Sequence, residues 1–171
     1  MKKLLLLFVL AFGLQQTLHA QKTLKVWVVR HAEKDTTDKK DRDPDLSSAG
    51  AERAEALKKE LKSQRIDSIF STDYKRTKLT VFPLADITGI SIKTYDPTKA
   101  KDLAKSLKDN AAGKKILIVG HSNTILEMLE AFGAKRPVPS VSDDEYDYLF
   151  LLTIKGDKVD VKTNKYGVKS N

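Results

Sequence analysis

The 171-residue chain contains no cysteine, so it can form neither a disulfide nor a zinc site with thiolate ligands. The absence suits an oxidising compartment and also removes the usual attachment residue of a lipid anchor. Long apolar runs are scarce as well. The one that stands out, Leu4 to Leu14, is too short to span a bilayer.

That run has the features of an export signal. Lys2 and Lys3 precede it, and Leu18-His19-Ala20 follows it as a small-residue cleavage site. We therefore expect residues 1–20 to be a signal peptide and residues 21–171 to form one domain, since about 150 residues suffice to bury a core. The expected location is secreted or periplasmic, with no stable membrane insertion after signal removal; an uncleaved anchor is the alternative.

The charge is strongly basic but carries no recognition pattern. The formal charge of +8 falls to +6 without Lys2 and Lys3. Most of the basic residues are lysines scattered among acidic ones, and no basic stripe is interleaved with aromatic residues. This pattern is typical of a solvated surface, so we expect no nucleic-acid partner.

Predicted strands and helices alternate along the chain. Apolar runs predict strands at 26–29, 66–70, 90–95 and 115–120, and two extended runs predict a hairpin of 146–154 with 158–162. Helices are predicted over 47–63, after Ser71-Thr72-Asp73 with a kink or restart at Pro83, over 96–112, and from the turn His121-Ser122-Asn123 to about residue 133. The alternation predicts an α/β fold, a three-layer α/β/α domain with a mostly parallel central sheet.

Two details of this pattern concern the first helix and the loop before it. Ser47 is the expected N-cap of the first helix. Its expected buried stripe is Ala51, Ala54, Leu57 and Leu61. Residues 33–45 form a charged segment that we expect to be a mobile surface loop near the site. Its aspartates, Asp41, Asp43 and Asp45, with Glu52 vaguely resemble a calcium loop, but Leu46 stands where the tight turn needs glycine.

Scarce basic side chains cluster at predicted strand ends. Beyond the signal the chain has two histidines, and both, His31 and His121, directly follow apolar runs. Arg30 adjoins His31, and Arg76 begins the helix after the second strand. Ligands of open α/β sheets bind beyond the carboxyl ends of the strands, so these four side chains should share one crevice. The other arginines, Arg42, Arg53, Arg65 and Arg136, are assigned to loop or helix surfaces.

Such a cluster of basic groups would repel itself unless an anion filled the crevice. Arginine forks match phosphate oxygens, and a neutral imidazole can act as a nucleophile that splits phosphoryl transfer into two steps. The remaining cations would stabilise the transferred phosphoryl group without a metal. The alternative is an ion-pair network that bridges the strand ends, but no comparable carboxylate cluster is placed to receive it.

These residues resemble a known family. Arg30-His31-Ala32-Glu33 is similar to the Arg-His-Gly signature of the histidine phosphatase superfamily, and the segment 46–50, Leu-Ser-Ser-Ala-Gly, to its Leu-Thr-x-x-Gly helix start. The segment 71–77 with Thr80 resembles its second-arginine block, and Gly120-His121-Ser122 its second-histidine block. The resemblance runs in order from about residue 24 to 154. It implies the phosphoglycerate mutase-like fold in a small, branch 1 form.

The resemblance also implies roles for individual residues. His31 would be the nucleophile that forms a phosphohistidine, with His121 as its catalytic partner at the phosphate. Arg30 and Arg76 would bind the phosphate, with Lys34 and Ser122 as further phosphate-binding residues. Ala32 replaces the usual glycine, which a tight turn tolerates if its backbone angles stay negative.

The general acid is not settled by the sequence. Relatives place this residue after the third strand, which here offers Asp96 in Tyr95-Asp96-Pro97. Asp96 is equally suited to cap the following helix. Glu33 is the second candidate for the acid. Asp143, Asp144 and Glu145 are more distant ones.

The resulting expectation is an exported, metal-independent phosphatase that hydrolyses phosphomonoesters through a phosphohistidine. Its partners would be a phosphorylated small-molecule substrate and inorganic phosphate as product, with no cofactor. A phosphohistidine protein phosphatase is one alternative. A non-catalytic phosphate-binding module of the same fold is another. A mutase is disfavoured because the chain has little room for extra segments.

Overall fold

The computed structural model describes residues 22–170, so the predicted signal peptide lies outside the described residues. The described part is built on one six-stranded sheet with the strand order β3-β2-β4-β1-β5-β6. The strands are β1 (Leu24–Arg30), β2 (Ser68–Ser71), β3 (Ile92–Thr94), β4 (Lys115–Gly120), β5 (Tyr148–Lys155) and β6 (Lys158–Lys165). The first four strands are parallel to one another, whereas β5 pairs antiparallel with both β1 and β6.

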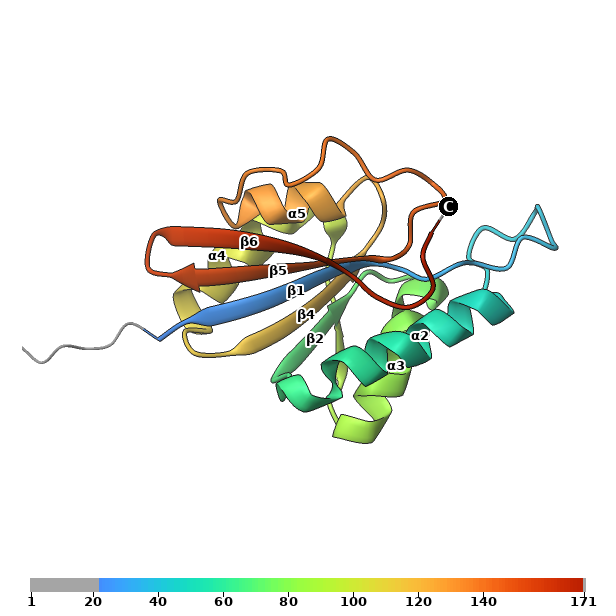
Figure 1. Cartoon of the computed structure of the whole chain (residues 1–171), viewed down its shortest axis with the longest axis horizontal. Coiled ribbons are helices and arrows are strands. Elements are labelled where there is room, and N and C mark those ends of the chain that lie inside the picture. The colour runs from blue at the N-terminus through green and yellow to red at the C-terminus, as the bar shows by residue number, and fades with distance from the viewer. Residues whose placement is uncertain (1–21, 171) are drawn as a thin grey trace, which may run out of the picture.

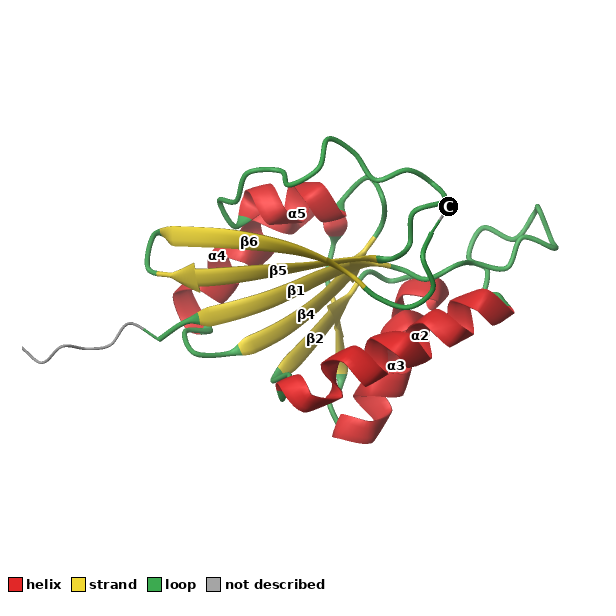
Figure 2. Cartoon of the chain, viewed as in Figure 1, coloured by secondary structure: helices red, strands yellow, loops and turns green. Residues whose placement is uncertain are grey.

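Helices cover both faces of this sheet (Figures 1 and 2). On one face lie α2 (Ser48–Leu61) and α3 (Lys75–Thr88), and on the other α4 (Ala100–Asn110) and α5 (Ile125–Ala131). Short 3-10 turns, η1 (Lys62–Gln64) and η2 (Pro97–Lys99), extend α2 and precede α4. The predicted three-layer α/β/α architecture with a mostly parallel sheet is therefore confirmed.

The central strands are apolar throughout because they are buried on both faces. In β1, Val26 and Val28 pack into the core that α4 and α5 close, while Trp27 and Val29 pack into the core beneath α2 and α3. Neighbouring β4 alternates in the same way. Two separate cores thus pack against the two faces of β1 and β4, and this packing fixes the positions of their carboxyl ends.

Several predicted details are wrong. Ala51 is exposed, and the buried side of α2 is formed by Gly50, Arg53, Ala54, Leu57 and Leu61. The helix α3 is continuous across Pro83, so the restart, one of the two predicted alternatives, is wrong. The last helix, by contrast, begins at Ile125, so His121 and Ser122 lie before it, in agreement with the predicted turn.

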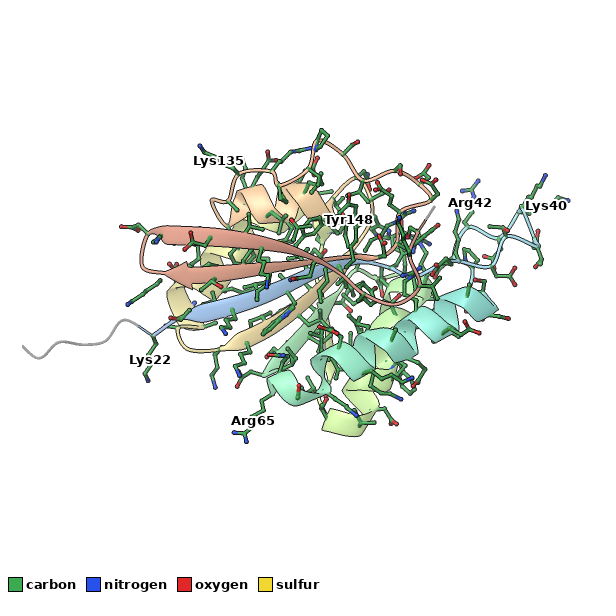
Figure 3. The ribbon with its side chains drawn as sticks, in the orientation of Figure 1. Lys22, Lys40, Arg42, Arg65, Lys135 and Tyr148 are labelled. Atoms are coloured by element: carbon green, nitrogen blue, oxygen red, sulfur yellow. The ribbon has the colours of Figure 1, made fainter. Side chains whose placement is uncertain are left out.

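The predicted loop 33–45 leaves the body of the molecule and returns to it, and the labelled Lys40 and Arg42 lie at its outer part (Figure 3). Lys34 and Leu46 form a β-bridge at its base, and the Asp35 N–H donates to the Asp45 carbonyl at 2.8 Å. Among residues 22–170, no helix has the length and apolar character needed to cross a membrane.

Candidate active site

The two histidines meet where β1 and β4 end. Arg30 is in register with Gly120, and the His31 N–H donates to the Gly120 carbonyl at 2.9 Å. This pairing brings the rings of His31 and His121 edge to face, with 5.3 Å between their centroids. Side chains 90 positions apart in the sequence thus share one site because their strands are parallel neighbours.

His31 is held as a neutral imidazole. Its side chain lies at the end of β1 with the residue 5% exposed, and its Nδ1 contacts the Ala32 carbonyl at 2.8 Å. A carbonyl only accepts, so Nδ1 carries the proton and Nε2 keeps a lone pair. The pKa of His31 is lowered to about 3, mainly by burial and also by Arg30, His121 and Arg76, against the Ala32 hydrogen bond that raises it. At neutral pH the ring therefore has a nucleophilic nitrogen.

A chain of hydroxyl groups orients His121. The Thr77 hydroxyl has the carbonyls of Thr72 and Tyr74 as acceptors, the Thr72 hydroxyl donates to Thr77 Oγ1 at 3.1 Å, and Thr72 Oγ1 is 2.9 Å from His121 Nε2. In this arrangement Nε2 is the donor and the proton is on that nitrogen. Burial, with Arg76 and Arg30 nearby, lowers the pKa of His121 to about 4. The second imidazole is neutral as well.

Two arginines, each stacked on a tyrosine, flank the histidines. The Arg30 guanidinium lies 3.9 Å from the centroid of the Tyr146 ring, and Arg76 lies 4.3 Å from that of Tyr74. In both arginines the buried Nε has no hydrogen-bond partner among the described residues. Burial lowers the pKa of Arg30. A buried guanidinium without full hydrogen bonding is costly, so these groups are suited to receive an anion.

Arg30 is fixed by the loop before β5. Its Nη1 donates to the carbonyls of Ser142 at 2.7 Å and Glu145 at 3.0 Å. The same loop is tied to the C-terminal segment, since the Tyr146 N–H donates to Ser170 Oγ and the Ser170 N–H to the Asp147 carboxylate. The fork and the aromatic ring beneath it are therefore preorganised by residues far from β1 in the sequence.

The site opens as a pocket of about 370 Å³. It is lined by the basic cluster and by neighbouring polar and aromatic residues: Arg30, His31, Lys34, Tyr74, Arg76, Pro97, His121, Ser122, Asn123, Thr124 and Asp143. Six of the eight residues predicted for the site are in this lining. Asp96 and Glu33 are not.

Two carboxylates approach the arginines from exposed loops. Asp143 Oδ1 lies 3.8 Å from Arg30 Nη2 and accepts a hydrogen bond from the Ser122 hydroxyl at 3.4 Å. Asp43, in the loop 33–45, lies 3.5 Å from Arg76 Nη1 and accepts the Lys75 N–H. Both contacts are long for ion pairs with arginine, so they leave the guanidinium forks able to bind a further anion.

The motif residues that do not line the pocket position those that do. The Thr80 hydroxyl accepts the Ala32 N–H at 2.8 Å and donates to the Arg76 carbonyl at 2.7 Å, which joins the end of β1 to α3. Gly50 packs on the backbone of Glu33 so closely that a Cβ atom would lie 2.1 Å from the Glu33 carbonyl oxygen. Ala32 has a negative φ, because Arg65 alone among the described non-glycine residues has a positive one. It therefore fits the turn where relatives have glycine.

Asp96 behaves as a helix cap. Its side chain is exposed, and Oδ1 accepts from the Thr98 N–H at 2.9 Å and from the Thr98 hydroxyl at 2.7 Å. These hydrogen bonds lower the pKa of Asp96. A carboxyl group held ionised in this way is poorly suited to donate a proton.

Glu33 points away from the pocket and into a buried ion pair. Its carboxylate receives Arg53 Nε at 2.9 Å and Arg53 Nη2 at 2.7 Å. Arg53 is 5% exposed and also donates to the Tyr166 carbonyl. The assignment of Arg53 to the helix surface is therefore wrong. An arginine in an amphipathic helix pattern does not indicate which carboxylate it will pair with, so the pair of Arg53 with Glu33 could not be predicted from the sequence.

The sequence analysis also missed Tyr146, Tyr74, Thr72 and Asp43. Tyr74 and Thr72 lie inside the quoted second-arginine block, so that motif was the available signal. Tyr146 and Asp43 lie in loops, where no periodicity marks a residue as part of a site. Within residues 22–170, no group of three histidine, aspartate or glutamate side chains is arranged to hold a metal ion.

Comparisons with known proteins agree with this geometry. The model of the histidine phosphatase superfamily (branch 1) matches residues 26–98, which include Arg30, His31 and Arg76. No curated protein matches the sequence significantly.

Solved structures share the fold at low sequence identity. The protein histidine phosphatase SixA, complexed with tungstate, is 15% identical, with 85% of this chain and 96% of that chain covered and a TM-score of 0.64. A mycobacterial glucosyl-3-phosphoglycerate phosphatase is 12% identical, with 84% and 98% covered and a TM-score of 0.64. YhfR from Bacillus stearothermophilus is 16% identical, with 82% and 96% covered and a TM-score of 0.66.

These neighbours have the phosphoglycerate mutase-like α/β fold, and the family match supports a phosphatase of the histidine phosphatase type. The resemblance found in the sequence is thus confirmed, and the family that this chain resembles in both sequence and structure is the histidine phosphatase superfamily, branch 1.

Proposed function

We propose that the chain is an exported, metal-independent phosphatase that hydrolyses phosphomonoesters through a phosphohistidine on His31. The observation that carries the proposal is a neutral imidazole, Nε2 unprotonated, beside buried Arg30 and half-buried Arg76, whose buried Nε atoms have no hydrogen-bond partner among the described residues. A phosphate dianion would supply those partners. The export part rests on the N-terminal sequence pattern.

Each residue of the pocket has a role in this mechanism. The guanidinium groups of Arg30 and Arg76 bind the phosphoryl oxygens, with Lys34 and the Ser122 hydroxyl at the rim. His31 Nε2 attacks phosphorus, and the ester oxygen leaves on the opposite side. Because His121 Nε2 donates to Thr72, its Nδ1 has no proton in the neutral ring and donates to a phosphoryl oxygen only after the bound dianion has led the ring to take up a proton. The fixed positive charge then stabilises the transition state.

A labelling experiment tests this function. The wild-type chain, incubated with a ³²P-labelled phosphomonoester and quenched, should carry an acid-labile, base-stable label. The label and turnover should both be lost in His31→Ala, whereas exposed Lys135→Ala should retain both. Undiminished activity in EDTA is expected. Normal turnover by His31→Ala would reject the proposal.

A phosphohistidine protein phosphatase is the second candidate, favoured by the similarity to SixA and by the open pocket. Export argues against it, because histidine kinases and their phosphorelays work in the cytoplasm. Specificity constants for a phosphohistidine protein and for sugar phosphates would separate the two activities. Preference for the phosphoprotein by two orders of magnitude or more would establish the second candidate.

A non-catalytic phosphate-binding module is the remaining alternative. It predicts that vanadate or phosphate binds while no chromogenic phosphomonoester is hydrolysed between pH 4 and 8. Formation of the labelled enzyme described above would exclude it.

A further inference from the structure

We infer that Asp143 is the general acid of this site, an inference that rests on the proposed phosphatase function. The sequence pattern favoured Asp96 and Glu33 for this role. The geometry of the pocket points instead to the loop before β5, which carries Asp143 over the mouth of the site.

Asp143 lies in the wall of the pocket. Among the described residues that line the pocket, Asp143 is the sole carboxylate. Its side chain is fully exposed and lies 3.8 Å from Arg30 Nη2 and 3.4 Å from the Ser122 hydroxyl. It thus stands beside both a phosphate-binding arginine and the residue next to His121.

Asp143 also suits the direction in which the leaving group departs. In an in-line displacement the leaving oxygen lies opposite the nucleophile. His31 is 5% exposed and forms the floor of the pocket, so a leaving group departs toward the mouth. Asp143 lines this pocket with a fully exposed side chain, whereas Glu33 is paired with Arg53 and lines a different pocket.

The neighbouring carboxylates are already engaged. Asp144 accepts from the Ser142 hydroxyl at 2.6 Å, and Glu145 accepts from the Ser142 N–H at 2.8 Å. These bonds form a compact turn that Arg30 fixes through the Ser142 and Glu145 carbonyls. The turn leaves the Asp143 side chain directed at the pocket and free of such bonds within its own loop.

The reaction then proceeds in two balanced steps. His31 Nε2 forms a bond to phosphorus as the phosphorus–oxygen ester bond breaks, and the Asp143 carboxyl proton passes to the leaving oxygen to give the alcohol. The resulting carboxylate takes a proton from water as the water oxygen attacks the phosphohistidine. The phosphorus–nitrogen bond breaks with its electron pair returning to Nε2, and inorganic phosphate leaves.

The test compares leaving groups. An alkyl phosphate such as β-glycerophosphate needs a protonated leaving oxygen, whereas 2,4-dinitrophenolate leaves without a proton. In Asp143→Asn, we expect phosphoenzyme formation from β-glycerophosphate, followed by rapid quench, to slow by about 10²- to 10⁴-fold. Formation from 2,4-dinitrophenyl phosphate should stay within about fivefold of wild type, and the phosphoenzyme should accumulate because its hydrolysis lacks a base.

Matched variants separate the possible failures. Asp144→Asn, in the same loop but outside the pocket lining, should react with both substrates at wild-type rates, and Asp143→Glu should recover part of the alkyl phosphate activity. Equal losses on both substrates, or no loss on β-glycerophosphate, would overturn the assignment of Asp143 while wild-type labelling upholds the function. Absence of any phosphoenzyme in the wild type would instead reject the function itself.

Discussion

At the scale of single residues, folding places two histidines in a buried, positively charged site that disfavours their protonation. Both imidazoles are kept neutral by burial and by arginines, with the pKa of His31 near 3 and that of His121 near 4. An unfolded histidine titrates near pH 6.5. Between these values the unfolded chain binds protons that the native chain does not, so stability must fall as pH falls.

The first prediction concerns this pH dependence. Because the folded pKa values are depressed, the contribution is complete above pH 6.5 and is lost progressively toward pH 3 to 4. From pH 7 to 4.5 we expect the free energy of unfolding in urea to drop by about 2–4 kcal/mol. Carboxylates with lowered pKa values act only below about pH 4, so this window reports the histidines. A His31→Asn variant should flatten the profile by about half; an unchanged profile would contradict the pKa assignments.

The second prediction separates a structural carboxylate from a catalytic one. Glu33→Gln leaves the buried Arg53 guanidinium without its charged partner and should cost about 1–3 kcal/mol in urea unfolding. Phosphomonoester turnover by the folded variant should stay within about threefold of wild type, since Glu33 lies outside the pocket lining. Exposed Glu52→Gln is the control for stability. A hundredfold fall in turnover would make Glu33 a catalytic residue after all.

At the scale of elements, the start of α2 and the end of β1 are built against each other. Ser47 caps α2 through the Gly50 N–H, the Ser47 N–H donates to the Glu33 carbonyl, and Gly50 lies against that same carbonyl. The Leu-Ser-Ser-Ala-Gly motif is therefore a seat for the segment that follows His31.

The third prediction follows from this contact. In Gly50→Ala the new Cβ would stand 2.1 Å from the Glu33 carbonyl oxygen, so backbone must move, and we expect a loss of about 1–3 kcal/mol in thermal or urea unfolding. Helix propensity alone predicts the opposite sign, a gain of about 1 kcal/mol. Exposed Ala51→Gly should cost about 1 kcal/mol by propensity and leave activity unchanged. Stabilisation by Gly50→Ala would contradict this prediction and show that the backbone near Glu33 moves at little cost to accommodate a Cβ atom at position 50.

Elements were also what the sequence predicted best. Buried strands such as β1 and β4 can be recognised in the sequence by their continuous apolar residues. Because the two strands pair in parallel, His31 and His121 at their ends lie side by side. Neither the burial of Arg53 nor the direction of the Asp143 side chain could be predicted from the sequence, because each depends on how a loop packs against the sheet. No local pattern encodes how a loop packs, so the sequence placed the basic side chains in one pocket but could not show which carboxylate lines it.

At the scale of the whole molecule, the pocket is a basic cavity at one edge of a two-core sheet. The fourth prediction is that inorganic phosphate stabilises the native state, by about 2.7 kcal/mol at a hundredfold excess over its dissociation constant. For a chain of this size the melting temperature should rise by about 5–10 °C. Arg76→Ala should abolish the rise, and Lys135→Ala, outside the pocket lining, should preserve it. A phosphate effect that survives Arg76→Ala would place the anion elsewhere.

The stacking of Arg30 on Tyr146, with Tyr146 tied in turn to Ser170, has a consequence for biosynthesis. A nascent chain that ends within α5 already contains both imidazoles, yet the Arg30 guanidinium beside them has no Tyr146 ring to stack on. Catalytic activity should therefore appear only once translation has passed Tyr146 and Ser170, rather than grow in proportion to the length translated. Fragments released early would be inert toward the phosphate esters around them.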